Sequence, residues 1–175
     1  MRIAITGASG LVGANVAEQA IAQGHEVVCL KRGSSRVAHL DHLPIRWASG
    51  DLGDEDALAR GFEGAQWVVH SAAVVEAGTR VTEAMRETNV GGTRRVIAAC
   101  RRAAVQRLVH VSTAAAIGVS DDGADVTEDH PFNFAAHGLL DGYTETKRAA
   151  QDLVLGEARA GVGQPVQTGF QRVSL

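Results

Sequence analysis

A tyrosine and a lysine four residues apart form the pair of side chains with the clearest chemical potential in the sequence. Tyr143 and Lys147 lie in a segment with helical periodicity, and a spacing of four places the phenol and the ammonium on one helix face. A nearby cation favours the phenolate, so the phenol could exchange a proton with a carbonyl or an alcohol near neutral pH. The alternative interpretation is an ordinary pair on a helix surface.

A second chemical motif is a run of three glycines, spaced by three, between an apolar segment at 2–6 and a helical pattern at 11–23. The first glycine permits a tight turn, the second lets a pyrophosphate approach the backbone, and the third lets the helix lie close to the sheet. Free N–H groups at the helix start attract the anion. We expect a dinucleotide site here, and a purely structural turn is the alternative. Its expected residues are Gly7, Ser9, Gly10, Leu11, Val12 and Gly13.

Two cations follow the second apolar run, where a site for NAD usually presents an acidic residue to the ribose 2′-OH. Lys31 and Arg32 could instead pair with a 2′-phosphate, so NADP(H) is favoured over NAD(H). Arg32 is the better candidate because its planar guanidinium suits a phosphate, and a solvated cation pair is the alternative. Asp51, after the third run, could accept a hydrogen bond from an adenine amino group or be an ordinary turn residue.

The order of apolar and helical segments predicts the elements that must position these residues. Apolar runs at 2–6, 26–30, 45–48, 67–70 and 107–112 alternate with helical patterns at 11–23, 55–61, 81–104 and 142–159, the third interrupted near Gly91 and Gly92. Nearly all-apolar strands alternating with helices predict an α/β, Rossmann-like doubly wound parallel sheet. Ligands of such sheets bind at the carboxyl ends of the strands, so we expect Thr113 to hydrogen-bond a substrate oxygen.

Taken together, the motifs resemble those of the extended short-chain dehydrogenase/reductases, the NAD(P)-dependent epimerase/dehydratase superfamily. The resemblance covers residues 2–161 and is greatest to the dihydroflavonol-reductase and 3β-hydroxysteroid-dehydrogenase-like branches. The matching motifs are Thr6-Gly7-x-x-Gly10-x-x-Gly13, Gly50-Asp51-Leu52, His70-Ser71-Ala72-Ala73, Asn89-Val90-Gly91-Gly92-Thr93, Val111-Ser112-Thr113 and Tyr143-x-x-x-Lys147.

This resemblance implies roles for individual residues. It implies that Asp51 touches the adenine, with Leu52 as a further cofactor residue, and that Ser71, Ala72 and Ala73 line the cofactor. Lys147 would bind the nicotinamide ribose and Tyr143 would be the catalytic acid or base. Thr113 would be the hydroxyl partner of Tyr143, and Asn89 a supporting catalytic residue. A homodimer built on helices is a further expectation from the family, as is a small-molecule substrate.

The length of the chain bounds what it can contain. Its 175 residues suit one domain, whereas family members continue into a sixth strand and a substrate domain. We expect an NAD(P)-binding Rossmann domain at 1–161 and an atypical tail at 162–175, with the sheet stopping before strand six and the substrate domain absent. Turnover is therefore left open. Three functions remain: an NAD(P)-dependent oxidoreductase, a catalytically silent NADP(H)-binding module or truncated product, and a nucleotide-sugar epimerase or dehydratase.

Composition argues against several other classes. A net charge of −3 with scattered cations does not favour nucleic-acid binding. No apolar run approaches the roughly 18 residues of a membrane span, and the isolated cysteines, Cys29 and Cys100, suit a reducing compartment, so we expect a cytoplasmic protein. His70 and His110 lie in strands without other ligands at metal-binding spacing, so we expect core histidines and no metal site.

Overall fold

A single parallel sheet organises the chain in the computed structural model, which describes residues 1–76, 80–159 and, as backbone, 166–169. The strand order is β3-β2-β1-β4-β5-β6, and every pairing is parallel. This order starts at the centre of the sheet, runs to one edge and returns to the other, which confirms the doubly wound Rossmann-like α/β fold. The strands are β1 (Arg2–Thr6), β2 (Glu26–Lys31), β3 (Arg46–Ser49), β4 (Trp67–His70), β5 (Arg107–Val111) and β6 (Val166–Gly169).

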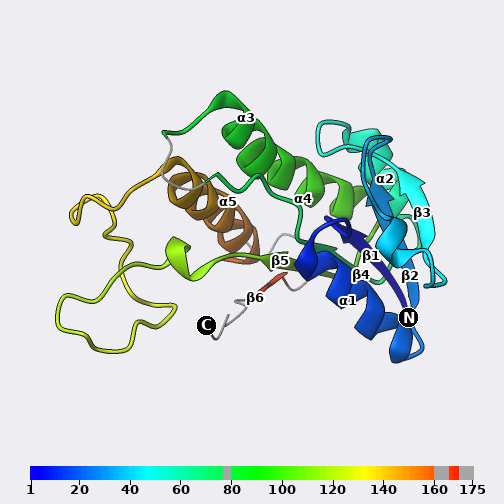
Figure 1. Cartoon of the computed structure of the whole chain (residues 1–175), viewed down its shortest axis with the longest axis horizontal. Coiled ribbons are helices and arrows are strands. Elements are labelled where there is room, and N and C mark those ends of the chain that lie inside the picture. Colours follow the sequence, from blue (N-terminus) through cyan, green and yellow to red (C-terminus); the bar gives the residue numbers. More distant parts are fainter. Residues whose placement is uncertain (77–79, 160–165, 170–175) are drawn as a thin grey trace.

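Helices cover both faces of the sheet (Figure 1). They are α1 (Leu11–Ala22), α2 (Glu55–Phe62), α3 (Glu83–Met85), the π-helical η2 (Arg86–Gly91), α4 (Gly92–Arg102) and α5 (Gly142–Arg159), with short 3₁₀ turns η1 (Ala38–Leu40) and η3 (Ala114–Ala116). Helix α1 packs on one face, and α2, α4 and α5 pack on the other. Helices α4 and α5 lie side by side there.

The apolar strands are explained by this two-sided burial. Successive side chains of a strand point to opposite faces, so Ile3 and Ile5 pack toward α1 while Ala4 packs toward the other helices. Polar positions are therefore confined to the ends of the central strands. At the carboxyl ends the chain leaves the sheet, and the predicted ligand-binding segments follow.

The long helical segment expected at 81–104 continues through its two glycines rather than breaking there. A π-helical stretch, η2, joins α3 to α4 directly. A π-helical turn accommodates one more residue than an α-helical turn, so it changes which side chains share a face along the segment. Hydrophobic periodicity carries no sign of such an insertion.

Our expectation that the sheet stops before strand six is wrong. Residues Val166–Gly169 pair in parallel with β5, in a register that sets Val166 opposite Leu108. The outer edge of β5 presents backbone N–H and C=O groups that bind any extended segment, so pairing there does not need the apolar pattern expected of a family strand. The proposed boundary near residue 161 and the rest of the tail lie outside the described residues.

The contact between α1 and the glycine turn generates a stability prediction. A Cβ at Gly13 would lie 2.4 Å from Gly7 O, so Gly13→Ala must push the helix away from the turn. We expect the free energy of unfolding in urea to fall by about 1–3 kcal/mol, as overpacking elsewhere does. The matched control is Gly156→Ala in α5, where the new Cβ meets nothing within 4 Å. This control should gain about 0.5–1 kcal/mol, and similar effects of the two variants would refute the packing argument.

Candidate functional site

A cavity of about 320 Å³ lies at the carboxyl ends of the central strands. Five segments distant in sequence meet around it: the glycine turn after β1, the segments at the ends of β2, β3 and β4, and the helical segment of η2 and α4. Most of the predicted cofactor residues line it, namely Gly7, Ser9, Gly10, Lys31, Arg32, Asp51, Leu52, Ser71, Ala72 and Ala73. Leu11, Val12 and Gly13 are outside the lining, and their role in binding stays a prediction. Leu11 is 80% exposed at the start of α1.

The three glycines of the turn differ in what requires them. Gly7 has φ +81°, and a Cβ there would lie 2.6 Å from Ala72 N, so both its conformation and its neighbour exclude a side chain. Gly13 also leaves no room for a side chain, because a Cβ there would lie 2.4 Å from Gly7 O. At Gly10 a Cβ would meet only Gly7 O, at an ordinary 3.5 Å. The protein's own packing therefore does not require a glycine at position 10, which agrees with the expectation that this position is kept open for a ligand.

The start of α1 suits an anion. Gly10 occupies the N-cap position without a side-chain cap, and the first turn contains no acidic residue. The first N–H groups of a helix lack partners within it, and the helix dipole adds a partial positive charge there. A pyrophosphate over Gly10 would meet these donors without electrostatic opposition from the helix itself.

The two cations at the carboxyl end of β2 occupy different environments. The ammonium of Lys31 lies 5.1 Å from the centre of the ring of Trp47 on β3, a cation–π contact. The Arg32 side chain is 67% exposed, with its Nε 3.9 Å from Asp51 Oδ2. Asp51 Oδ1 meanwhile accepts a 2.8 Å hydrogen bond from the Gly53 N–H, which orders the turn before α2. Arg32 is thus the less committed of the two cations at the cavity.

Lys147 is held in place at the carboxyl end of β5. Its side chain projects from α5, and its Nζ donates a 2.7 Å hydrogen bond to Val111 O. The residue is 5% exposed, and burial lowers its pKa from 10.5 to about 8. Lys147 therefore remains a cation at neutral pH, with two further N–H donors beyond the one bound to Val111.

Thr113 and Tyr143 lie in the segments on either side of the loop that links β5 to α5. Thr113 caps η3, its Oγ1 accepting a 3.3 Å hydrogen bond from the Ala115 N–H. Tyr143 is half-buried in the first turn of α5, which Asp141 caps by accepting a 2.7 Å hydrogen bond from Thr144 N–H. Neither residue lines the cavity described above, and neither do Lys147 and Asn89. The residues predicted to be catalytic and those predicted to bind the cofactor thus form two groups along the same edge of the sheet.

Asn89, predicted as a supporting residue, joins these two groups. It is buried on η2, where its Oδ1 accepts a 2.8 Å hydrogen bond from Val74 N–H. Its Nδ2 donates to Val74 O at 3.0 Å and to Thr146 Oγ1 at 3.1 Å. Val74 lines the cavity, while Thr146 is the neighbour of Lys147 on α5. One amide therefore fixes the segment after β4 relative to the helix of the predicted acid or base.

Two buried histidines lie beside this amide, with their rings 5.4 Å apart. Thr93 Oγ1 donates its proton to Asn89 O, so toward His70 it can only accept, and it receives a 3.1 Å hydrogen bond from His70 Nε2. With its proton on Nε2, His70 accepts a 2.7 Å hydrogen bond from Thr6 Oγ1 at Nδ1. Neither ring nitrogen of His110 has a partner among the described residues. Burial lowers the pKa of His70 to about 3, with a smaller contribution from the charge of Lys147. Burial also lowers the pKa of His110 to about 2, with smaller contributions from the charges of His70 and Lys147.

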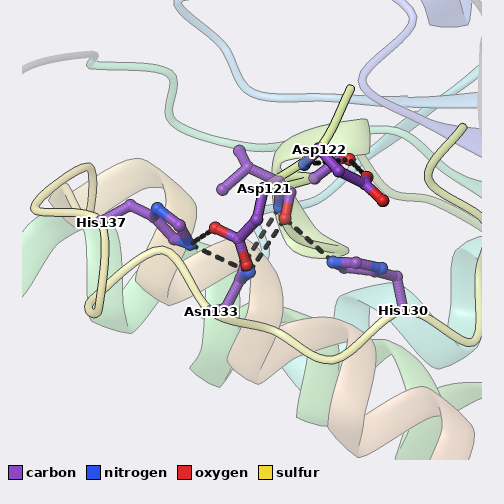
Figure 2. A network of polar contacts seen from close by, with 7 residues as sticks. Asp121, Asp122, His130, Asn133 and His137 are labelled. Atoms are coloured by element: carbon purple, nitrogen blue, oxygen red, sulfur yellow. Dashed lines mark hydrogen bonds and ion pairs between the residues drawn. The ribbon is translucent and has the colours of Figure 1, made fainter. Parts of the chain in front are cut away.

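The loop between η3 and α5 has its own polar framework (Figure 2). Asn133 binds both backbone groups of Val119, accepting from its N–H and donating to its C=O, each at 2.9 Å. His137 Nε2 lies 3.2 Å from Asp121 Oδ1, and Arg148 of α5 donates to Ala116 O at 3.2 Å. The first contacts hold the polar loop to itself, and Arg148 holds α5 to η3.

The residues predicted to bind the cofactor leave out part of the cavity wall. Its further lining residues are Thr6, Leu30, Ser35, Gly50, Gly53, Leu58, Val74, Glu87, Thr88 and Arg95. Thr6 and Gly50 belong to the quoted motifs and Leu30 precedes Lys31, so the sequence could have indicated these three residues. Glu87 and Arg95 lie eight residues apart on a helical segment whose register a π-helix alters, so no sequence signal places both at the cavity. Within the described ranges, no group of three or more His, Cys, Asp or Glu side chains could hold a metal.

Comparison with known proteins identifies the family of the chain. The family described as "NAD dependent epimerase/dehydratase family" matches residues 3–168. The chain is 37% identical over 157 residues to a Synechocystis sp. protein named provisionally as a dihydroflavonol 4-reductase, covering 90% of this chain and 45% of that protein. It is 34% identical over 162 residues to a 3 beta-hydroxysteroid dehydrogenase/Delta 5→4-isomerase of Mycobacterium tuberculosis, covering 89% and 42%.

Solved structures give the same result. The crystal structure of gox2253 has a TM-score of 0.85 and 31% identity, covering 95% of this chain and 49% of that one. PA4631, a nucleoside-diphosphate-sugar epimerase from Pseudomonas aeruginosa, has a TM-score of 0.79 and 26% identity, covering 97% and 51%. The Bordetella bronchiseptica enzyme WbmH, in complex with NAD⁺, has a TM-score of 0.79 and 26% identity, covering 97% and 55%. The chain thus spans about half the length of the proteins it matches.

Of the helices in the described part of the chain, none is both long enough and apolar enough to cross a bilayer.

The buried histidines predict how stability depends on pH. Their pKa values in the folded protein lie below the ordinary 6.5, so between these values the unfolded chain binds protons that the folded chain does not. Folding is therefore weakened as the pH falls below about 6.5, with each histidine contributing up to about 1.4 kcal/mol per pH unit. We expect the pair to lower the free energy of unfolding by about 2–3 kcal/mol between pH 7.5 and 5.5.

The variant His110→Leu isolates one of these contributions. It removes an imidazole whose nitrogens have no hydrogen-bond partner in the described part of the chain. The variant should halve the pH-dependent loss that the pair causes, which urea unfolding at both pH values would measure. Replacing an unpaired polar group by an apolar one of similar size costs little at pH 7.5. An unchanged pH dependence in the variant would contradict the assignment of a neutral, buried His110.

Proposed function

The chain belongs to the NAD dependent epimerase/dehydratase family, and we propose that it is an oxidoreductase that uses NADP(H) to interconvert a carbonyl and an alcohol. The observation that carries the proposal is the meeting of the glycine turn, Arg32 and Asp51 at one cavity, on the same sheet edge as Tyr143 and Lys147. Related proteins named as a reductase and a hydroxysteroid dehydrogenase support this chemistry. Because the chain spans about half of their length, the activity of the whole protein is part of the proposal.

The residues present fit a dinucleotide. The open space over Gly10 and the uncapped start of α1 form a cradle that a side chain at this position would fill. The WbmH structure, which holds NAD⁺, supports a dinucleotide in this fold. When bound, the nicotinamide would donate or accept the hydride. Gly10 and the first N–H groups of α1 would hold the pyrophosphate.

We assign the choice of cofactor to Arg32. Lys31 has its ammonium over Trp47, whereas the guanidinium of Arg32 is exposed and forms a long ion pair to Asp51. Exposed ion pairs of this length contribute little, so Arg32 can turn to a 2′-phosphate at small cost. A planar guanidinium then binds two phosphate oxygens at once. This arrangement supports NADP(H) over NAD(H).

The acid–base role falls to Tyr143. Lys147, fixed by Val111 O and protonated at neutral pH, lies one helical turn away on α5, where its ammonium would hold the nicotinamide ribose beside the phenol. Tyr143 would give its proton to a carbonyl oxygen during reduction and take one from an alcohol during oxidation. Thr113 would hydrogen-bond the same oxygen. Asn89 contributes by holding Thr146, and through it the start of α5.

A second candidate function is epimerisation or dehydration of a nucleotide sugar. The similarity to PA4631, a nucleoside-diphosphate-sugar epimerase, favours it. The same tyrosine and lysine would serve that reaction, but the cofactor would stay bound between turnovers. Release of NAD(H) from the purified, denatured protein would support the epimerase, and cofactor-free protein that binds added NADPH would support the reductase.

Cofactor choice is tested by Arg32→Ala. We expect the affinity for NADPH to fall by about 1.5–3 kcal/mol, the contribution of a hydrogen bond to a charged group, with much less change for NADH. The increase in melting temperature on cofactor addition measures both. Arg36→Ala, an exposed cation outside the cavity, should match the wild type, and Gly10→Val should bind neither cofactor. Equal losses for the two cofactors would show that Arg32 is only a solvated cation.

Turnover is tested by Tyr143→Phe, which removes only the phenolic hydroxyl. With NADPH and a panel of aromatic and steroidal ketones, we expect cofactor oxidation to slow by about 100-fold or more, the range for loss of a general acid. The melting-temperature increase with NADPH should be retained. Undiminished turnover in the variant would remove Tyr143 from the mechanism, and cofactor binding without any turnover by the wild type would favour a silent binding module.

A further inference from the structure

The helical wall of the cavity contains a fixed guanidinium that belongs to none of the predicted site residues. Arg95 of α4 has its Nη2 2.5 Å from Glu87 Oε1, and its Nη1 donates to Leu52 O at 3.4 Å. Its side chain is 29% exposed, less than half the exposure of Arg32. All four of these residues line the same cavity. Arg95 is therefore a cation whose position at the cavity is set by an ion pair and a backbone acceptor, whereas Arg32 has a longer ion pair and greater exposure.

The π-helix explains why two residues eight positions apart can pair. In an α-helix, residues eight positions apart are separated by two full turns plus about 80° of rotation about the axis. One additional residue in a π-helical turn reduces the offset to about 20°. Residue 87 lies within η2 and residue 95 within α4, so the π-helical turns between them bring the two side chains onto one face.

Two glycines keep this arrangement free of obstruction. A Cβ at Gly91 would lie 2.9 Å from Glu87 Oε2 and 3.3 Å from Arg95 Nη1. A Cβ at Gly92 would lie 3.0 Å from the Leu52 side chain. Glycine within a helix costs about 1 kcal/mol relative to alanine, so consecutive glycines here need a reason. Room for the ion pair and for the approach of Leu52 supplies one.

We propose that Arg95, oriented by Glu87 and by Leu52 O, is a nucleotide-binding residue that contacts the adenosine part of the cofactor. The proposal rests on the function proposed above and extends its cofactor site. Leu52 follows Asp51 in the segment expected at the adenine, so a side chain bonded to Leu52 O lies on the base side of the cavity. Two interactions leave Arg95 with further N–H donors, which suit the acceptor nitrogens of adenine.

The charge of Arg95 also separates its role from that of Arg32. Glu87 neutralises the guanidinium, so Arg95 adds base contacts rather than a second phosphate site. Its contribution should therefore be independent of the 2′-phosphate. Arg32, exposed and distant from its carboxylate, should act on the 2′-phosphate alone.

Calorimetric titration of the purified chain with AMP and with adenosine 2′,5′-bisphosphate separates the two arginines. Arg95→Ala should weaken both ligands by a similar factor of about ten, the effect of losing one hydrogen bond to a charged group. Arg32→Ala should weaken only the bisphosphate. Arg94→Ala, the exposed neighbour outside the cavity, should bind both ligands as the wild type does. Wild-type affinity of Arg95→Ala for both ligands would overturn the proposal.

Failure of the site as a whole would look different. If the wild-type chain binds neither ligand, the proposed cofactor site itself is wrong. If Arg95→Ala unfolds at a lower urea concentration than the wild type, the variant Arg95→Lys distinguishes a ligand-binding role from a structural one. It keeps the charge opposite Glu87 but lacks the planar fork, so we expect weaker binding of both ligands. Wild-type affinity in Arg95→Lys would assign the pair a structural role only.

Discussion

Close contact between backbones at the glycine turn is the constraint on which the rest of the structure depends. Gly7 lies against the backbone of Ala72, and Gly13 lies against Gly7, both at distances that leave no space for a Cβ. These contacts fix the end of β1, the start of α1 and the segment after β4 relative to one another. The cavity forms between them because only Gly10 of the three glycines faces space that the protein does not fill.

A layer of buried polar groups connects that cavity to the helix of the proposed acid–base residue. Asn89 binds Val74 on one side and Thr146 on the other, and Thr93 links its backbone to His70. Buried groups of this kind stabilise one arrangement because each displaced partner would leave an unsatisfied donor or acceptor. The depressed pKa values of Lys147 and His70 follow from the same burial.

The π-helix η2 gives this layer its geometry. It carries Asn89 toward Val74 and, through its altered register, aligns Glu87 with Arg95 at the cavity wall. A regular helix through this segment would separate these side chains by rotation about its axis. The element thus contacts both groups of proposed site residues, and its irregularity occurs where the two groups meet, as π-helical turns at functional sites often do.

The sequence by itself determined the fold class and most of the cavity. Apolar runs of strand length, alternating with helical periods, require a sheet buried on both faces, and that burial confines Gly7, Arg32 and Asp51 to the carboxyl ends of strands. Tyr143 and Lys147 were identifiable because their spacing is local to one helix. Tertiary structure alone decided the rest: the pairing of Val166–Gly169 with β5, the commitment of Lys31 to Trp47, and the meeting of Glu87, Arg95 and Leu52. Each depends on an edge, a neighbouring strand or a helical register that no local pattern encodes, because the free energy that selects it comes from groups distant in the chain.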